Sequence, residues 1–214
     1  MERIAVFCGS SIGHNPIYAD EAKKLGIYMA KNNIGLVYGG GKIGMMGVIA
    51  DAVMENKGEV IGIIPYLLRH EEVAHTSITE MIVTKKMSKR KVKMSRLVDG
   101  YIAMAGGFGT LDEIFEVLTL GQLGIEGKPI GILNTNGYFN STLIQLDVMV
   151  SEGFLKQENK NMVWAVRKAK TELKGSNYAS TYVSEDPKYR VKNAGENVNG
   201  PFTDYGPEIV DNRL

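Results

Sequence analysis

The sequence is poor in the residues that form disulfides and metal sites, with one cysteine and three histidines among 214 residues. A single cysteine cannot form an internal disulfide, so we expect a reducing compartment, the cytoplasm. Cys8 lies in the apolar run IAVFC, where we expect a buried hydrophobic group rather than a nucleophile. His14, His70 and His75 lack the spacing of metal ligands, so we expect surface or local hydrogen-bonding roles and no metal site.

The sequence also lacks a charge excess and a long hydrophobic run. Its 25 Lys and Arg against 24 Asp and Glu give a formal net charge of +1, which offers no electrostatic reason to bind nucleic acid or an anionic membrane. It has no transmembrane run, and the N-terminus lacks the pattern of a signal peptide. We therefore expect a cytoplasmic globular protein with neither nucleic acid nor membrane as partner.

Short apolar segments alternate with amphipathic ones along the chain. Val- and Ile-rich runs, typical of strands buried on both faces, lie at 3–8, 34–38, 59–64, 100–105 and 128–133, with a weaker run at 81–84. Helical patterns lie at about 17–32, 43–57, 89–98, 110–123, 138–152 and 157–170. This order predicts an α/β, Rossmann-like three-layer fold in which helices flank both faces of a central parallel sheet.

The composition changes near residue 175. Residues 1–174 carry the strand and helix patterns and form the expected nucleotide-binding domain. Residues 175–214 are polar, rich in Asn and Gly, and have no period. We expect a C-terminal extension that is either disordered or wrapped on the body or on a dimer partner.

Three of the predicted strands end in loops of small residues: CGSSIG, YGGGKIGMMG and AGGFGT. Each loop precedes a helix, and parallel strands bring their carboxyl ends to one end of the sheet. Backbone N–H groups at helix N-termini bind phosphate without a cationic side chain. The candidate ligand contacts in these loops are Gly9, Ser10, Gly40, Gly41, Gly107, Phe108, Gly109 and Thr110.

Neither of two common nucleotide-binding fingerprints fits these loops. A dinucleotide site needs an acidic residue at the end of the second strand, where the sequence has Tyr38-Gly39. A Walker A loop needs a hydroxyl residue after its lysine, but Ile43 follows Lys42. The sequence therefore disfavours an NAD dehydrogenase and an ATP hydrolase.

The acidic residues after the third glycine loop allow two interpretations. Thr110 and Glu113 have the spacing of a capping box, in which Thr110 is the N-cap and Glu113 reaches back to the N-cap amide. The same spacing also suspends the Glu113 carboxylate over any ligand bound at the loop. Asp112 and Glu116 are expected to be solvated helix residues. The residues alone leave both interpretations of Glu113 open.

The basic segment KKMSKRKVKM at 85–94 is also ambiguous. Most such runs form the solvent-facing side of a helix. If the segment instead overlies the carboxyl ends of the strands, one guanidinium can offer a planar fork to phosphate or ribose oxygens. Arg90 and Arg96 are the two arginines available, and the residues do not choose between them.

Three stretches together resemble the LONELY GUY family of cytokinin riboside 5′-monophosphate phosphoribohydrolases, often labelled lysine decarboxylase-like: YGGGKIGMMGVIADAV, HEEVAHTSITEMIVTKKMSKRKVKM and AGGFGTLDEIFEVLTLGQLGIEGKPIGILNTNGYF. The resemblance covers roughly residues 3–155, and the family motifs PGGxGTxxE and Met-x-x-Arg-Lys correspond to residues 105–113 and 87–91. It implies that Arg90 and Glu113 are the catalytic pair and that residues 107–110 hold the phosphate. It also implies further nucleotide contacts by Glu72, Lys91 and Thr119.

The implied reaction is hydrolysis of the N-glycosidic bond of a purine nucleoside 5′-monophosphate to free base and ribose 5-phosphate, by a homodimer without a cofactor. The alternative is a non-catalytic carrier of a nucleotide or phosphorylated cofactor. Decarboxylation is disfavoured because Lys42 is the one lysine inside a glycine loop and nothing marks a pyridoxal phosphate pocket around it.

Two departures from the family motifs concern the candidate site. Ala105 replaces the usual proline, and Ser88-Lys89 replace the usual His-Glu or His-Gln. Loss of the proline is expected to loosen the loop while leaving its glycines and carboxylate in place. The sequence leaves open whether the substrate is a cytokinin ribotide, AMP or another nucleotide.

Overall fold

The computed structural model of the protein describes residues 2–69 and 74–166. His70 and the expected ligand contact Glu72 lie outside the described residues, as does the whole predicted extension at 175–214.

Seven strands form one sheet in the order β4-β3-β2-β1-β5-β6-β7. Every neighbouring pair is parallel, so the prediction of a central parallel sheet is confirmed. All residues of the inner strands β2 and β3 are buried, as their continuous apolar runs predict. The strands are β1 (Arg3–Phe7), β2 (Gly35–Tyr38), β3 (Val60–Pro65), β4 (Glu80–Thr84), β5 (Gly100–Ala103), β6 (Ile130–Leu133) and β7 (Val163–Val166).

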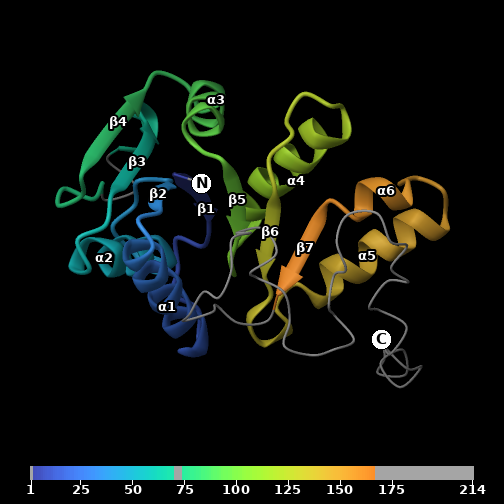
Figure 1. Cartoon of the computed structure of the whole chain (residues 1–214), viewed down its shortest axis with the longest axis horizontal. Helices are drawn as coiled ribbons and strands as arrows, with labels where there is room; N and C mark the ends of the chain where they lie inside the picture. Colours follow the sequence, from blue (N-terminus) through green and yellow to red (C-terminus); the bar gives the residue numbers. More distant parts are fainter. Residues whose placement is uncertain (1, 70–73, 167–214) are drawn as a thin grey trace. The chain divides into compact units, whose positions relative to one another are not determined.

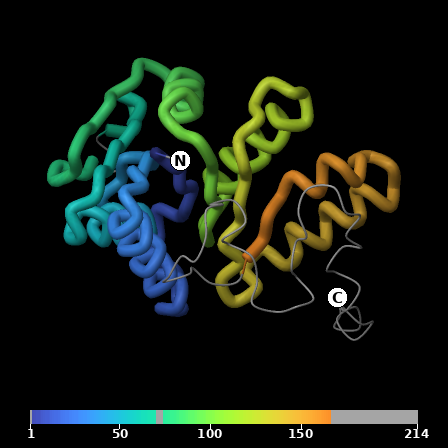
Figure 2. Tube along the Cα trace, viewed as in Figure 1, coloured from blue at the N-terminus to red at the C-terminus, as the bar shows by residue number. Residues whose placement is uncertain are grey.

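The helices connect these strands in two directions. Helices α1 and α2 lead from β1 through β2 to β3, whereas α3 and α4 lead back from β4 through β5 to β6. Because such crossovers are right-handed, the two pairs cover opposite faces of the sheet, and Figures 1 and 2 show them on either side of the strands. The helices are α1 (Ile17–Lys31), α2 (Gly44–Glu55), α3 (Met87–Leu97), α4 (Phe108–Gln122), α5 (Asn140–Ser151) and α6 (Gln157–Lys160), with short 3-10 helices at Tyr66–Leu68 and Thr135–Gly137.

The last predicted helix is wrong. The sequence pattern predicts a helix over 157–170, but α6 ends at Lys160 and β7 follows at Val163–Val166, parallel to β6. The sequence of β7, VWAV, is rich in β-branched and aromatic residues, which fit a half-buried strand better than a helix. Pairing with β6 therefore outweighs the weak helical period.

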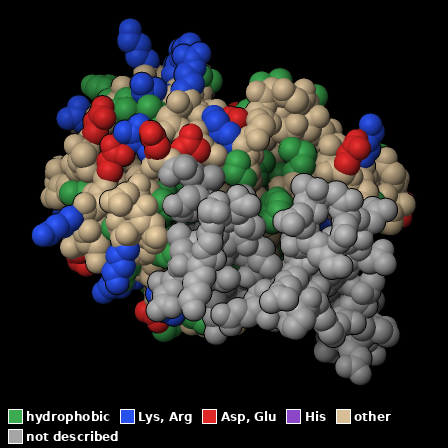
Figure 3. Space-filling model, in the orientation of Figure 1, with side chains coloured by type: hydrophobic (Ala, Val, Ile, Leu, Met, Phe, Trp, Pro, Cys, Tyr) green, Lys and Arg blue, Asp and Glu red, His purple; other side chains and the backbone are tan. Residues whose placement is uncertain are grey.

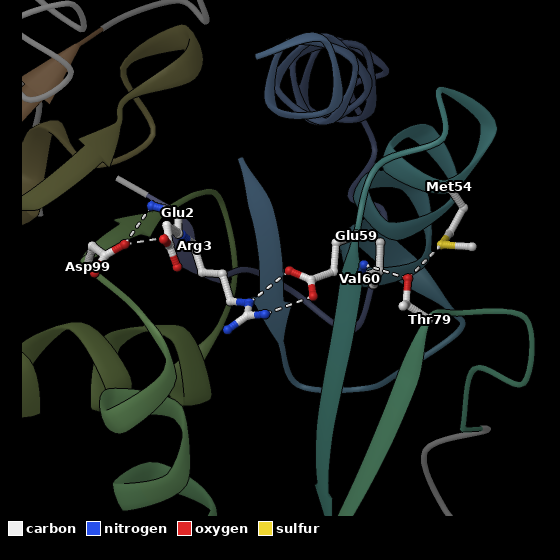
Figure 4. A network of polar contacts seen from close by, with 7 residues as sticks. All are labelled: Glu2, Arg3, Met54, Glu59, Val60, Thr79 and Asp99. Carbon is white, nitrogen blue, oxygen red and sulfur yellow. Dashed lines mark hydrogen bonds and ion pairs between the residues drawn. The ribbon is translucent and has the colours of Figure 1, made fainter. Parts of the chain in front are cut away.

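Polar contacts join the strands at their amino ends, opposite the glycine loops (Figure 4). Arg3 of β1 reaches across β2 to Glu59, just before β3, with distances of 2.7 Å from Nε to Oε2 and 2.9 Å from Nη2 to Oε1. The hydrogen bonds and charge of Arg3 lower the pKa of the Glu59 carboxyl. Asp99, just before β5, accepts hydrogen bonds from the backbone N–H groups of Glu2 and Arg3. These contacts tie together the amino ends of β3, β1 and β5.

The glycine loops after β1 and β2 touch one another at Gly44, the first residue of α2. Gly44 has φ +66°, and a Cβ atom there would overlap the backbone of Ser10. Two residues further on, the Met46 N–H donates to the Gly9 carbonyl at 3.4 Å. The absence of a side chain at Gly44 therefore allows the two loops to pack backbone against backbone.

We expect Gly44→Ala to destabilise the protein more than Gly124→Ala, which serves as its matched control. Gly124 has a similar φ of +70°, but no described atom lies within 4 Å of the position of its Cβ. Alanine at either site costs about 1–2 kcal/mol for the left-handed backbone. Gly44→Ala adds the overlap with Ser10, at about 1–3 kcal/mol more. Urea unfolding measures both; equal losses would mean that the loops do not pack as described.

Candidate active site

The N-terminus of α4 carries the third glycine loop. Strand β5 ends at Ala103, Gly107 is the N-cap of α4, and no side chain caps the helix. The first N–H groups of a helix have no intrahelical acceptor, so they point outward from its N-terminus. Apart from the adjoining residues and the backbone of α4 itself, no described atom lies within 4 Å of a Cβ placed on Gly107 or Gly109. The loop thus offers backbone donors and room beside them, the arrangement that suits an anion.

The capping-box interpretation of Thr110 and Glu113 is wrong. The helix begins at Phe108, so Thr110 is its third residue and not the N-cap. The Thr110 side chain is buried against Gly106 instead. The glycine at 107 ends the extended segment without a side-chain cap, which lets the helix start two residues earlier than expected. Glu113 is then the sixth helical residue, one turn too far along to reach the N-cap amide.

Glu113 pairs instead with Arg90 of α3. The Arg90 Nη2 atom lies 3.0 Å from the Glu113 Oε1 atom, and each side chain is only 12% exposed. Arg90 also donates from Nε to the Ile63 carbonyl of β3 at 2.9 Å and from Nη1 to the Met87 sulfur at 3.4 Å. The guanidinium therefore lies at the carboxyl ends of the strands. Of the two arginines that the sequence left open, Arg90 occupies this position, while Arg96 is exposed in the last turn of α3.

Both interpretations of the basic segment are correct, each for different residues: Arg90 lies at the carboxyl ends of the strands, and most of the lysines face solvent. Met94 is the buried residue of α3, whereas Lys85, Lys86, Lys89 and Lys93 are exposed. Figure 3 shows Lys and Arg side chains standing out over the part of the molecule where α3 lies in Figure 1. Lys89 and Lys93 thus lie on the solvated face of α3, and Lys85 and Lys86 are exposed just before the helix begins.

The Arg90 guanidinium occupies its place because residue 39 has no side chain. A Cβ atom on Gly39 would lie 2.6 Å from the Arg90 Nη2 atom and 2.9 Å from the Met46 sulfur. Gly40 and Gly41 were the ligand contacts expected in this loop, whereas the role of Gly39 was not expected from the sequence. Three consecutive glycines after a strand were the available signal.

Lys91 joins α3 to α4 a second time. Its Nζ atom lies 2.7 Å from both the Asp112 Oδ2 and the Glu116 Oε2 atoms. Partial burial lowers the pKa of Lys91, but hydrogen bonds to the two carboxylates outweigh it, so the pKa is raised overall. Asp112 and Glu116 were expected to be merely solvated; both pair with Lys91 while staying partly open to solvent. Together with Arg90–Glu113, these pairs fix the spacing of the two helices.

The glycine loop after β2 is held by His75. The His75 N–H donates to the Gly40 carbonyl at 3.0 Å, and Gly41 forms an isolated antiparallel bridge with Ala74. The ring lies between two partners: the Ser77 N–H donates to Nδ1 at 3.2 Å, and Nε2 lies 2.9 Å from the Asp51 carboxylate. Since Nδ1 accepts, the network assigns the proton to Nε2. The expected local hydrogen-bonding role is confirmed for this buried histidine.

The loop after β1 contacts the loop after β5. The Gly9 N–H donates to the Ala105 carbonyl at 3.0 Å, and Ser10 is exposed beside it. Cys8 is buried, and burial together with the nearby negative charge of Glu113 raises the pKa of its thiol. The thiol is therefore protonated at neutral pH, which confirms the expected core role.

Thr119 lies far from the expected ligand contacts at the start of α4, and Tyr138 makes a contact in this region that was not expected. Thr119 lies nine residues after Thr110, about 14 Å along α4, and its hydroxyl donates to the Phe115 carbonyl of the same helix at 2.7 Å. Tyr138, which the sequence analysis missed, donates its hydroxyl to the Gly106 carbonyl at 2.6 Å. Tyr138 lies at the NTNGYF end of a stretch that resembles the family, but the sequence does not indicate this contact, because it depends on the loops after β5 and β6 lying side by side.

Two further findings concern residues 2–69 and 74–166. Within them, no three His, Cys, Asp or Glu side chains are grouped so that they could hold a metal ion. None of the helices in these ranges is long and apolar enough to cross a membrane.

The glycine loops, the open N-terminus of α4 and the Arg90–Glu113 pair define a Rossmann-like protein with its candidate site at the carboxyl ends of the strands. A family model described as "Possible lysine decarboxylase" matches residues 46–175. The cytokinin riboside 5′-monophosphate phosphoribohydrolase LOG1 of Arabidopsis thaliana is 43% identical over 173 residues, 81% of each chain. LOG2 of the same plant is 39% identical over 201 residues, 94% of this chain and 93% of that one. The chain belongs to this LONELY GUY family.

Solved structures with the same fold include cofactor-binding proteins. The molybdenum cofactor binding protein from Rippkaea orientalis has a TM-score of 0.59 at 24% identity, covering 78% of this chain and 89% of that chain. The Moco carrier protein from Chlamydomonas reinhardtii has a TM-score of 0.58 at 20% identity, with the same coverage. These similarities establish the Rossmann-like fold and nothing about the ligand of this chain.

We expect Gly39→Ala to break the contact between Arg90 and Glu113, because the new methyl group takes the space of the guanidinium. A crystal structure of the variant should show these side chains farther apart than 4 Å, and urea unfolding should show a loss of about 1–3 kcal/mol. Gly127→Ala is the control, since no described atom lies within 4 Å of its Cβ position. A variant structure that retains the 3.0 Å contact would contradict the role given to Gly39.

Proposed function

We propose that the protein hydrolyses the N-glycosidic bond of purine nucleoside 5′-monophosphates, releasing the free base and ribose 5-phosphate. The observation that carries the proposal is the 3.0 Å pair between Arg90 and Glu113, beside the open N-terminus of α4. The phosphoribohydrolases LOG1 and LOG2, to which the chain is 43% and 39% identical, support the same reaction.

The phosphate of the substrate binds at the first turn of α4. Residues 107–110 supply backbone N–H groups, and the helix dipole favours a negative charge at this end. Gly107 and Gly109 leave the approach open, because no described atom beyond the adjoining residues and the backbone of α4 lies within 4 Å of their Cβ positions. This placement brings the ribose toward Glu113, which lies one turn further along α4.

Glu113 acts at the anomeric carbon. Cleavage of the bond between C1′ and the base nitrogen builds positive charge on the ribose, and the bonding electrons leave with the base. A carboxylate near C1′ stabilises that charge or takes a proton from the attacking water. The water supplies the hydroxyl group on C1′, and its proton is the one that the released base gains.

Arg90 orients the ribose phosphate and stabilises charge on the leaving side. Its guanidinium is planar and carries several donors, so it can bind oxygen atoms while it keeps Glu113 in place. The contacts with Ile63 and Met87 hold the arginine before substrate arrives. The structure thus supports a preorganised pair, which is the property that catalysis of this kind requires.

The remaining expected ligand contacts stay predictions. Gly9, Ser10, Gly40 and Gly41 lie in the loops at the same end of the sheet. Lys91 pairs with two carboxylates in the free protein, so a contact with substrate requires it to exchange a partner. Thr119 lies on the far part of α4, and Glu72 lies outside the described residues.

The family description as a possible lysine decarboxylase does not fit these residues. Pyridoxal phosphate chemistry needs a Schiff-base lysine and an acidic partner for the pyridine nitrogen. Lys42 is exposed, and it forms no ion pair with the described residues. We therefore propose hydrolysis without this cofactor.

A homodimer and a cytoplasmic location are part of the proposal. Large apolar side chains lie exposed on the described surface, as expected if part of it is covered by a second subunit. The most exposed are Phe154 at 87%, Leu67 at 79%, Ile125 at 70% and Phe108 at 94%. The cytoplasmic location rests on the single, buried cysteine.

The test is release of base from AMP and from N6-isopentenyl-AMP by the purified protein. We expect free base and ribose 5-phosphate from one or both, and a loss of roughly 100-fold or more in kcat for Glu113→Gln. Glu158→Gln is the control, because Glu158 is a largely exposed acid on α6, and it should match the wild type.

Two results would contradict the proposal. If neither nucleotide is cleaved and Glu113→Gln behaves like the wild-type protein in nucleotide binding, the assignment of the active site is wrong. Tight binding of AMP without release of base would favour the alternative function, a carrier of a nucleotide or phosphorylated cofactor.

A further inference from the structure

Tyr138 links the loop after β6 to the glycine loop that begins α4. Its hydroxyl donates to the Gly106 carbonyl at 2.6 Å, across 32 residues of sequence. Gly106 directly precedes Gly107, the N-cap of α4. Tyr138 thus contacts the backbone of the expected phosphate loop from outside the motif that defines it.

The position of Tyr138 is set by a turn with several internal contacts. Asn134, a buried residue, accepts a hydrogen bond from the Phe139 N–H at 2.7 Å and donates one to the Asn140 side chain at 2.9 Å. Asn136 and Gly137 both have positive φ, 54° and 72°, which turns the chain sharply before Tyr138. The turn therefore presents Tyr138 in one orientation.

Aromatic neighbours hold the Tyr138 ring. It packs edge-on against Tyr18 of α1, with ring centroids 5.6 Å apart, and against Phe139 at 5.1 Å. A Cβ atom on Gly13, in the loop after β1, would lie 3.4 Å from the Tyr18 ring. The Tyr138–Tyr18 pair therefore joins the loops after β5 and β6 and lies close to the loop after β1.

The hydrogen bond from Tyr138 fixes which way a glycine peptide faces. In a trans peptide the C=O and the following N–H point in opposite directions. With the Gly106 carbonyl bound to Tyr138, the N–H of Gly107 points away from Tyr138. The preceding carbonyl, of Ala105, accepts from the Gly9 N–H at 3.0 Å. Two successive carbonyls of the loop are thus held by neighbouring elements.

We propose that Tyr138 is a positioning residue for phosphate binding. The peptide between Gly106 and Gly107 is flanked by two glycines, whose backbone turns over at little steric cost. Without the Tyr138 hydroxyl, this peptide also samples the flipped orientation, in which the Gly106 carbonyl oxygen takes the place of the Gly107 N–H. A carbonyl oxygen repels the anion that the N–H would bind. The inference rests on the phosphate site of the proposed function, but not on hydrolysis.

The test measures by calorimetry how tightly the wild-type protein and Tyr138→Phe bind ribose 5-phosphate and adenosine. This variant keeps the ring contacts and removes the donor. We expect the Kd of ribose 5-phosphate to rise roughly three- to tenfold, the size of one hydrogen bond's net effect, and that of adenosine to stay unchanged. Tyr18→Phe is the control: it retains the partner ring, and its hydroxyl makes no hydrogen bond with the described residues. Its Kd values should equal those of the wild type.

Three outcomes would overturn the inference: wild-type Kd values for Tyr138→Phe, an equal rise for adenosine, or no binding of ribose 5-phosphate to the wild-type protein. A general structural role would produce the second result, because it would weaken every ligand. Base release is scored separately on the wild-type protein. Binding of ribose 5-phosphate without base release refutes hydrolysis but leaves the effect of Tyr138→Phe on phosphate binding measurable.

Discussion

The candidate site depends on one ion pair, between Arg90 of α3 and Glu113 of α4, at 3.0 Å and largely shielded from solvent. The two helices belong to successive crossovers of the sheet, so the pair forms only when β3, β5 and the loops beside them are in place. Gly39 makes room for the guanidinium, the Ile63 carbonyl orients it, and Lys91 fastens the same helices at a second point. Much of the surrounding structure serves to hold this pair.

Most of the fold could be predicted from the sequence, because strands buried on both faces leave continuous apolar runs. The strand β7 could not be predicted. It has only four residues at the edge of the sheet, too few to show an alternating hydrophobic pattern stronger than the helical pattern that overlaps them. The site was predicted in part. Motif resemblance pointed to Arg90 and Glu113, whereas Gly39 and Tyr138 act through contacts between distant loops. The capping box was one of two interpretations that the residues left open, and it was wrong because a glycine can start a helix without a side-chain cap.

Ala105 was the weakest point of the resemblance, because a proline usually stiffens this part of the loop. In the structure, two hydrogen bonds restrain the loop instead. The Ala105 carbonyl accepts one from the Gly9 N–H, and the Gly106 carbonyl accepts one from the Tyr138 hydroxyl. The loop is therefore held from two sides, by the segments after β1 and after β6. The departure at position 105 changes how the loop is stiffened and leaves its backbone donors available at the start of α4.

The most direct test of the account is a crystal structure of the protein with ribose 5-phosphate bound. The account predicts phosphate oxygens about 3 Å from backbone nitrogens of residues 107–110, and C1 of the sugar on the side of Glu113. A phosphate bound instead to the exposed lysines of α3, with residues 107–110 unoccupied, would contradict it.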